Sequence, residues 1–204
     1  EFRLKNYSEV LFEENFIIYM INSLIITSTA LFGQLYLASI TAYGIARFRY
    51  RFSNIIYLYI LIGLMFPVQI GILPLFLLIR GLNLNNTLFS VVIIYVASIS
   101  FPTFVLVGFL KSLPLEIVES AKIDGAGEWR IFHVITIPLM RPVFAALVPL
   151  IIIQFWNDFF IPLVFLTLDE IKTIPLGLMK FYAVRGLNFS KLNLVFTASA
   201  ISII

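Results

Sequence analysis

The sequence contains no cysteine and a single histidine, His133. Disulfide bonds and thiolate metal sites are therefore excluded, and one imidazole supplies too few ligands for a transition-metal site. We expect this chain to hold no metal, to bind no cofactor and to carry out no covalent catalysis.

Charged residues are also scarce, at 12% of the 204 residues, while 61% are hydrophobic and the mean hydropathy is +1.02. A soluble domain has roughly a quarter of its residues charged, so a water-soluble fold is excluded. The apolar residues form long continuous blocks, which favours helices that satisfy their own backbone hydrogen bonds in lipid. The sequence predicts one all-α domain over residues 1–204, a polytopic transmembrane helical bundle.

Four apolar blocks reach the length of about 20 residues that a helix needs to cross a bilayer. They cover residues 16–46, 55–79, 87–110 and 142–168, and a partial block covers residues 192–204. The chain starts at Glu1 without an initiator methionine and ends at Ile204 inside an apolar run. We therefore expect that both termini are truncated.

The formal charge of +3 arises from basic residues in the short loops between apolar blocks, which indicates membrane topology and not nucleic-acid binding. Arg47, Arg49 and Arg51 crowd the loop after the first block, so the positive-inside rule places that loop in the cytoplasm. The segment 111–141 is then also inside, while 81–86 and 169–191 are outside. A further spanning helix is expected before Glu1.

The longest polar insertion, residues 113–141, predicts a helix, a turn and a second helix on the inner face. Pro114 opens the first helix and Gly125 ends it. The second helix is predicted to stop at Pro138 and Pro142. A pair of interfacial helices resting on lipid headgroups fits the same periodicity.

The apolar positions of this insertion, Leu115, Val118 and Ile123, predict one buried face on its first helix. His133 lies in the second helix, and we interpret it as an interfacial or docking residue with no role in proton transfer.

Within this insertion, Glu119-Ser120-Ala121 is followed by Gly125 four residues after Ala121, and then by Ile135, Ile137 and Pro138. The run resembles the EAA loop of ABC importer permeases, whose pattern is EAA, three residues, Gly, nine residues and I-x-L-P. Ser120 and Ile137 depart from that pattern conservatively. Further segments resemble the carbohydrate-uptake, maltose-permease-like branch of binding-protein-dependent systems: Ile123-Asp124-Gly125-Ala126, Asn22-Ser23-Leu24, Ala42-Tyr43 and Trp156-Asn157-Asp158.

The resemblance implies a permease subunit of an ATP-binding-cassette importer in a prokaryotic plasma (inner) membrane. It implies a sugar delivered by an extracytoplasmic binding protein, a second homologous permease subunit, and a cytoplasmic ATPase dimer that holds ATP and Mg. The sequence has no GxxxxGK[ST] motif, so ATP hydrolysis is expected on a partner chain and not here. By resemblance, the residues that couple to the ATPase are Glu119, Ser120, Ala121, Asp124, Gly125, Ile135 and Pro138.

Polar residues also occur within the apolar blocks. Gln154, Asn157 and Asp158 are spaced i, i+3 and i+4, which predicts one face of a helix in the fourth block. This face is interpreted either as a wall of the solute pathway, with Trp156 stacking on a sugar, or as a contact between helices. Gln69 and Asn22 are weaker candidates for the same pathway.

Two other functions stay open at this point. One is an ABC importer permease for a non-sugar solute such as polyamine or phosphate, and the other is a secondary carrier outside the ABC class. A carrier would need an intramembrane ionisable relay or inverted repeats, for which Asp158 alone is thin support. Disaccharides, oligosaccharides and amino sugars all remain open as substrates.

Overall fold

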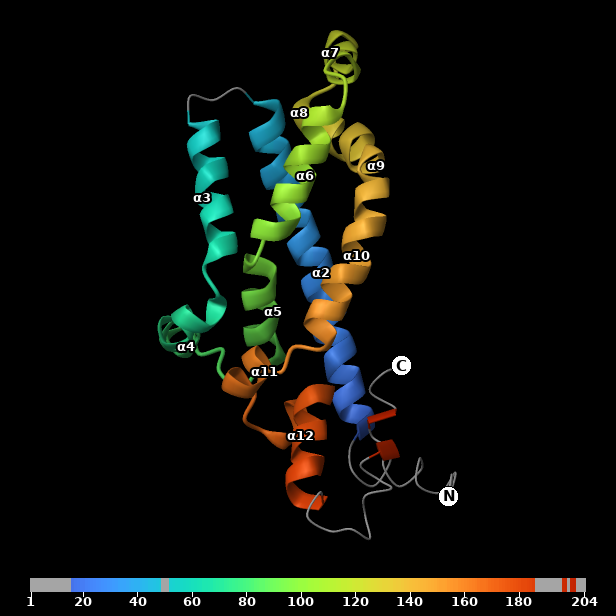
Figure 1. The fold of residues 1–204 in the computed structure, drawn as a ribbon. Helices are drawn as coiled ribbons and strands as arrows, with labels where there is room; N and C mark the ends of the chain where they lie inside the picture. The colour runs from blue at the N-terminus through green and yellow to red at the C-terminus, as the bar shows by residue number, and fades with distance from the viewer. Residues whose placement is uncertain (1–15, 49–51, 186–195, 198, 201–204) are drawn as a thin grey trace. The chain divides into compact units, whose positions relative to one another are not determined.

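The computed structural model describes residues 16–48, 52–185, 196–197 and 199–200 (Figure 1). Within these ranges the regular structure is helical throughout. The predicted all-α fold is confirmed.

The first predicted span is a single helix, α2 (Phe16–Arg47), long and apolar enough to cross a membrane. The stretch Leu88–Ser112, made of α5 (Leu88–Ala97) and α6 (Ser100–Ser112), also meets this criterion. Two pairs of helices meet it only when each broken pair is counted as one span: Ser53–Met65 with Val68–Gly81, and Glu128–Leu139 with Arg141–Trp156.

The second predicted span is broken near its middle. Helix α3 (Ser53–Met65) ends before Phe66 and Pro67, whose backbones are extended, and η2 (Val68–Gly71) and α4 (Ile72–Gly81) follow. Proline lacks an N–H group and disfavours helical geometry in the residue before it, so the helix ends here. The predicted span over residues 55–79 is therefore a broken pair of helices, and Gln69 lies exposed in the 3₁₀ turn.

The third predicted span is interrupted at Ser98 and Ile99, between α5 and α6. Pro102 has no N–H to donate to the carbonyl of Ser98, four residues earlier. Gln34, on α2, replaces that donor: its Nε2 lies 2.7 Å from the Ser98 carbonyl oxygen and 3.0 Å from the Ser98 hydroxyl.

The fourth predicted span is divided into α10 (Arg141–Trp156) and α11 (Phe160–Phe165). Pro162 is tolerated in the first turn of α11 but would interrupt a helix continuing from α10. The predicted span over residues 142–168 is therefore not one continuous helix. The chain continues through η4 (Asp169–Ile171) and α12 (Ile174–Arg185), and the fifth block lies largely outside the described residues.

The chain forms two compact units. The first unit comprises Glu1–Thr29, Leu73–Ile93 and Ile153–Ile204, and the second comprises Ala30–Ile72 and Ile94–Ile152.

In the first unit, α12 and the segment before it are fixed to the N-terminal part of α2. Asn22 donates its side-chain amide to the carbonyls of Glu170 and Lys172, at 2.9 and 3.0 Å, and Ser23 accepts from the Ile174 backbone at 3.0 Å. These bonds satisfy backbone groups that no regular element pairs.

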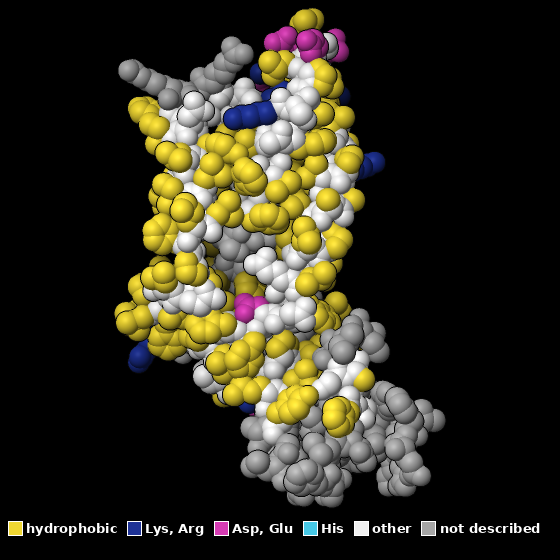
Figure 2. Space-filling view, viewed as in Figure 1, with side chains coloured by type: hydrophobic (Ala, Val, Ile, Leu, Met, Phe, Trp, Pro, Cys, Tyr) yellow, Lys and Arg dark blue, Asp and Glu magenta, His cyan; other side chains and the backbone are white. Residues whose placement is uncertain are grey.

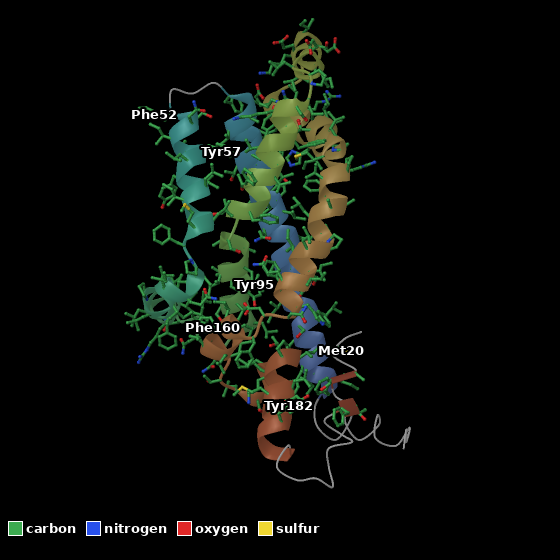
Figure 3. All side chains as sticks on the ribbon, in the orientation of Figure 1. Met20, Phe52, Tyr57, Tyr95, Phe160 and Tyr182 are labelled. Carbon is green, nitrogen blue, oxygen red and sulfur yellow. The ribbon has the colours of Figure 1, made fainter. Side chains whose placement is uncertain are left out.

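In the second unit, α3 packs beside α6. The ammonium of Lys111 lies 5.0 Å from the centre of the Tyr57 ring, which is labelled in Figure 3. A Cβ added to Gly63 would lie 2.6 Å from the Ser100 hydroxyl, so the glycine permits this close helix approach. None of the residues of α3 is buried, and hydrophobic side chains cover much of the surface seen in Figure 2.

Candidate functional site

The polar insertion forms the predicted helix, turn and helix, all within the second unit. Its elements are α7 (Glu116–Ile123), α8 (Glu128–Arg130), the π-helical segment η3 (Ile131–Thr136) and α9 (Ile137–Leu139). Helix α7 is labelled at the top of Figure 1. In Figure 2, acidic side chains cluster at the same place.

The turn after α7 is closed by Gly125, whose φ is +79°. The Gly125 N–H donates to the Lys122 carbonyl at 3.0 Å, and the Ala126 N–H donates to the Ala121 carbonyl at 2.9 Å. This pair of bonds is the Schellman motif, which needs a left-handed residue at the position of Gly125. The prediction that Gly125 ends the helix is confirmed.

Helix α7 buries a narrow face consisting of Val118 and Ala121, which are 7% and 8% exposed. The predicted buried face was only partly right, because Ile123 is 87% exposed and Leu115 is 45% exposed. Ile123 follows Val118 by five residues and therefore points away from it at 3.6 residues per turn. The outward face carries Glu119, Ser120 and Asp124, all exposed.

The second half of the insertion does not stop at Pro138 and Pro142 as predicted. Pro138 lacks an N–H, and the segment before it has π-helical bonds in which the Ile137 N–H donates to Phe132, five residues back. The chain then runs on through α9 into α10 with a bend of 71°. Ile135 and Pro138 are half-buried within this stretch.

Glu128 connects three parts of the second unit. The Tyr43 hydroxyl, on α2, donates to Glu128 Oε2 at 2.8 Å, and the Lys122 ammonium lies 2.6 Å from Oε1. The same ammonium lies 6.0 Å from the centre of the Phe48 ring. Sequence reasoning missed this arrangement because Tyr43 and Glu128 are 85 residues apart.

His133 is held by contacts within its own chain. Its Nδ1 lies 2.9 Å from the Trp129 carbonyl oxygen, and its Nε2 lies 3.2 Å from the Tyr36 hydroxyl. Its ring stacks on Trp129 with centroids 5.7 Å apart. His133 thus packs between the insertion and α2.

The polar residues 154–158 belong to the first unit and do not share a helical face. Helix α10 ends at Trp156, so only Gln154 lies on it, and the predicted common face was wrong. Asn157 Nδ2 donates to the Ile153 carbonyl at 2.9 Å, and Asp158 Oδ1 accepts from the Phe160 N–H at 2.8 Å. Asparagine and aspartate bind nearby backbone groups in this way and so favour helix ends.

The predicted role of these residues in a solute pathway stays a prediction. Gln154 and Asn157 are exposed, while Trp156 and Asp158 are half-buried. Asn22 is only 7% exposed, and its side-chain amide donates to the carbonyls of Glu170 and Lys172. These contacts indicate a structural role for Asn22.

An ionic cluster before α12 was not predicted. Asp169 accepts from Lys172 at 2.6 Å, from Lys180, and from the Tyr19 hydroxyl at 3.4 Å. The hydrogen bonds from Lys172 and Lys180 lower the pKa of the Asp169 carboxyl to about 2. Lys172 and Lys180 also line a cavity of about 350 Å³ beside Leu166.

The sequence of this chain is similar to those of bacterial permease proteins. The diacetylchitobiose uptake system permease protein NgcG of Streptomyces coelicolor is 37% identical over 182 residues, which are 89% of this chain and 60% of that protein. The arabinooligosaccharides transport system permease protein AraQ of Bacillus subtilis is 33% identical over 171 residues, 84% of this chain and 60% of that protein. The chain thus spans about 60% of the length of these two relatives.

A solved bacterial ABC transporter involved in the import of the acidic polysaccharide alginate shares the fold. Its matching chain has a TM-score of 0.80 and 24% sequence identity, over 97% of this chain and 73% of that one. The family model described as the binding-protein-dependent transport system inner membrane component matches residues 34–204. The chain therefore belongs to the family of inner membrane components of binding-protein-dependent transport systems.

Proposed function

We propose that this chain is a permease subunit of an ATP-binding-cassette importer. It forms part of the translocation pathway for a sugar that an extracytoplasmic binding protein delivers. A cytoplasmic ATPase dimer binds ATP and Mg and drives transport, and a second homologous permease subunit completes the pathway. The chain itself carries out no enzymatic reaction.

The observation that carries this proposal is the helix-turn-helix insertion, which exposes three of the EAA-like residues and buries Ala121 beneath them. Glu119, Ser120 and Asp124 are exposed on and just after α7, and Ile123 is 87% exposed. An exposed apolar side chain near the acidic residues Glu119 and Asp124 suits docking into a partner cleft with apolar and basic residues. We propose that the partner ATPase binds this surface of α7.

A sugar is favoured over polyamine or phosphate by the names of the relatives. The Streptomyces protein is named for diacetylchitobiose and the Bacillus protein for arabinooligosaccharides. Both names describe short oligosaccharides, so we propose a solute of that class. Gln154, Asn157 and Trp156 supply the hydrogen-bonding and stacking groups that a sugar requires.

Uptake by the full-length chain in proteoliposomes, with its partner permease, ATPase and binding protein, tests the proposal. ATP-dependent uptake of an oligosaccharide is expected, and uptake of spermidine or phosphate is not. Transport of sugar by this chain without the ATPase would contradict the proposal, as would ATP-dependent uptake of spermidine or phosphate alone.

A further inference from the structure

One face of α2 meets the polar insertion within the second unit. Tyr36, Ile40 and Tyr43 are spaced i, i+4 and i+7 and therefore lie along one side of the helix. Tyr36 contacts His133, 97 residues away, and Tyr43 contacts Glu128, 85 residues away. The contact thus joins two elements that are distant in the sequence.

The contact has a polar pair at each end and an aromatic side chain between them. The Tyr36 hydroxyl lies 3.2 Å from His133 Nε2, and the Tyr43 hydroxyl donates to Glu128 at 2.8 Å. Phe132, 2% exposed, has its ring centre 6.4 Å from that of Tyr36 and 5.3 Å from that of Tyr43. Both polar pairs fix the axial position of the insertion along α2.

Glu128 extends this contact to α7. Its other carboxylate oxygen lies 2.6 Å from the Lys122 ammonium, in the last turn of α7. The chain already connects α7 to α6 at one end and the insertion to α10 at the other. Among the described residues, α2 is not joined directly to the insertion along the chain, so displacement of α7 reaches it through non-covalent contacts such as these.

A cavity of about 240 Å³, open to the outside, lies beside the Tyr43–Glu128 pair and is lined by Ile40, Tyr43, Phe48, Glu128, Trp129 and Phe132. Close packing therefore does not enclose the pair on every side. The hydrogen bond and the ion pair at Glu128 are therefore the directional contacts that hold α7 and α2 together here.

We infer that Tyr43 and Glu128 are positioning residues that transmit movement of α7 to α2, with Lys122 as the link on α7. This inference rests on the proposed function, in which the ATPase moves α7. It identifies α2 as a third helix moved by the insertion, besides the two that are joined to it covalently.

The test uses the full-length chain assembled with its partner subunits in proteoliposomes. Solute taken up per ATP hydrolysed is measured for Tyr43→Phe, for Glu128→Leu and for the double variant. Each single change removes the Tyr43–Glu128 hydrogen bond and leaves the Tyr36–His133 pair, so the ratio is expected to fall about fivefold while ATP hydrolysis continues. The double variant is expected to be no worse than the more severe single variant, because both remove one shared contact.

The matched control is Tyr59→Phe on α3, which also removes a tyrosine hydroxyl but from a side chain that is 77% exposed. This variant should keep the wild-type ratio of uptake to ATP hydrolysis. The amount of assembled complex is measured for every variant. A wild-type ratio in both single variants would overturn the inference, as would loss of the assembled complex, which would make the two residues purely structural. Absence of ATP-dependent uptake by the wild type would instead overturn the proposed function.

Discussion

Gly125 and Gly127 lie in the same turn, and a Cβ added to either meets nothing within 4 Å. Only Gly125 has a positive φ, since Gly127 has φ −70° and ψ 158°. Steric crowding therefore cannot distinguish the two positions, and backbone conformation alone does.

We predict that Gly125→Val destabilises the turn by about 1–2 kcal/mol, the cost of a left-handed conformation for an L-residue, and uncouples ATP hydrolysis from uptake. The control Gly127→Val should change both properties much less, because its backbone is extended. Thermal unfolding of the purified chain and the ratio of uptake to ATP hydrolysis measure the two effects. Equal behaviour of the two variants would contradict the role given to the Gly125 turn.

The Asp169 cluster predicts a dependence of stability on pH. The folded pKa of about 2 lies below the ordinary aspartate value of 3.8, so the unfolded chain binds this proton more readily. The stabilisation is present above about pH 4 and is lost as the pH falls towards 2.

The variant Asp169→Asn should therefore unfold at a lower temperature than the wild type at neutral pH, and the difference should shrink between about pH 4 and pH 2. Thermal unfolding in detergent over this range measures it. A difference that is constant down to pH 2 would show that the carboxylate charge of Asp169 does not stabilise the fold. Because Asp169 is 43% exposed, solvent screening keeps the effect small.

At the scale of elements, α7 presents its acidic side away from the chain. We predict that Glu119→Lys lowers uptake per ATP several-fold, because a reversed charge would oppose a basic group on the ATPase. Glu170→Lys, the same change at an exposed residue of the first unit, is the control. Undiminished uptake by Glu119→Lys would count against docking through α7.

The break between α10 and α11 can be probed with cysteine, since this 204-residue sequence contains none. We predict that single cysteines at Gln154, Asn157 and Asp158 react with a small water-soluble thiol reagent in a manner that depends on ATP and sugar. Cysteines at Ile151 and Leu163 serve as controls. A position no more reactive than these controls in any nucleotide state contacts another helix and does not line the pathway.

At the scale of the whole molecule, the described residues offer at most four candidate spans, two of which have no bend of more than 40°. Large apolar side chains remain exposed, including Tyr59 and Met65 on α3. Lipid or other subunits must cover such surfaces. We predict that the full-length chain purifies with a second, related permease and two copies of the ATPase, which native mass spectrometry will count. A lone chain that transports sugar would contradict this assembly.

The sequence predicted the helical membrane class and the insertion because these depend on local information. Long apolar blocks and the spacing from Glu119 to Pro138 are readable along the chain, and Gly125 marks the turn by its conformational freedom. Helix breaks were predicted less well. The prolines were visible at Pro67, Pro102 and Pro162, but a membrane helix with proline either bends or ends according to what replaces the missing hydrogen bond.

The amino-acid sequence by itself determined that this protein is an all-α membrane chain with an EAA-like helix-turn-helix insertion. Only the tertiary structure decided which side chains satisfy the broken backbone and which elements hold the insertion. Gln34 pairs with Ser98 across 64 residues, Tyr43 with Glu128 across 85, and Asn22 with Lys172 across 150. Periodicity reports the faces of one element at a time, whereas these bonds depend on which faces meet when the helices pack.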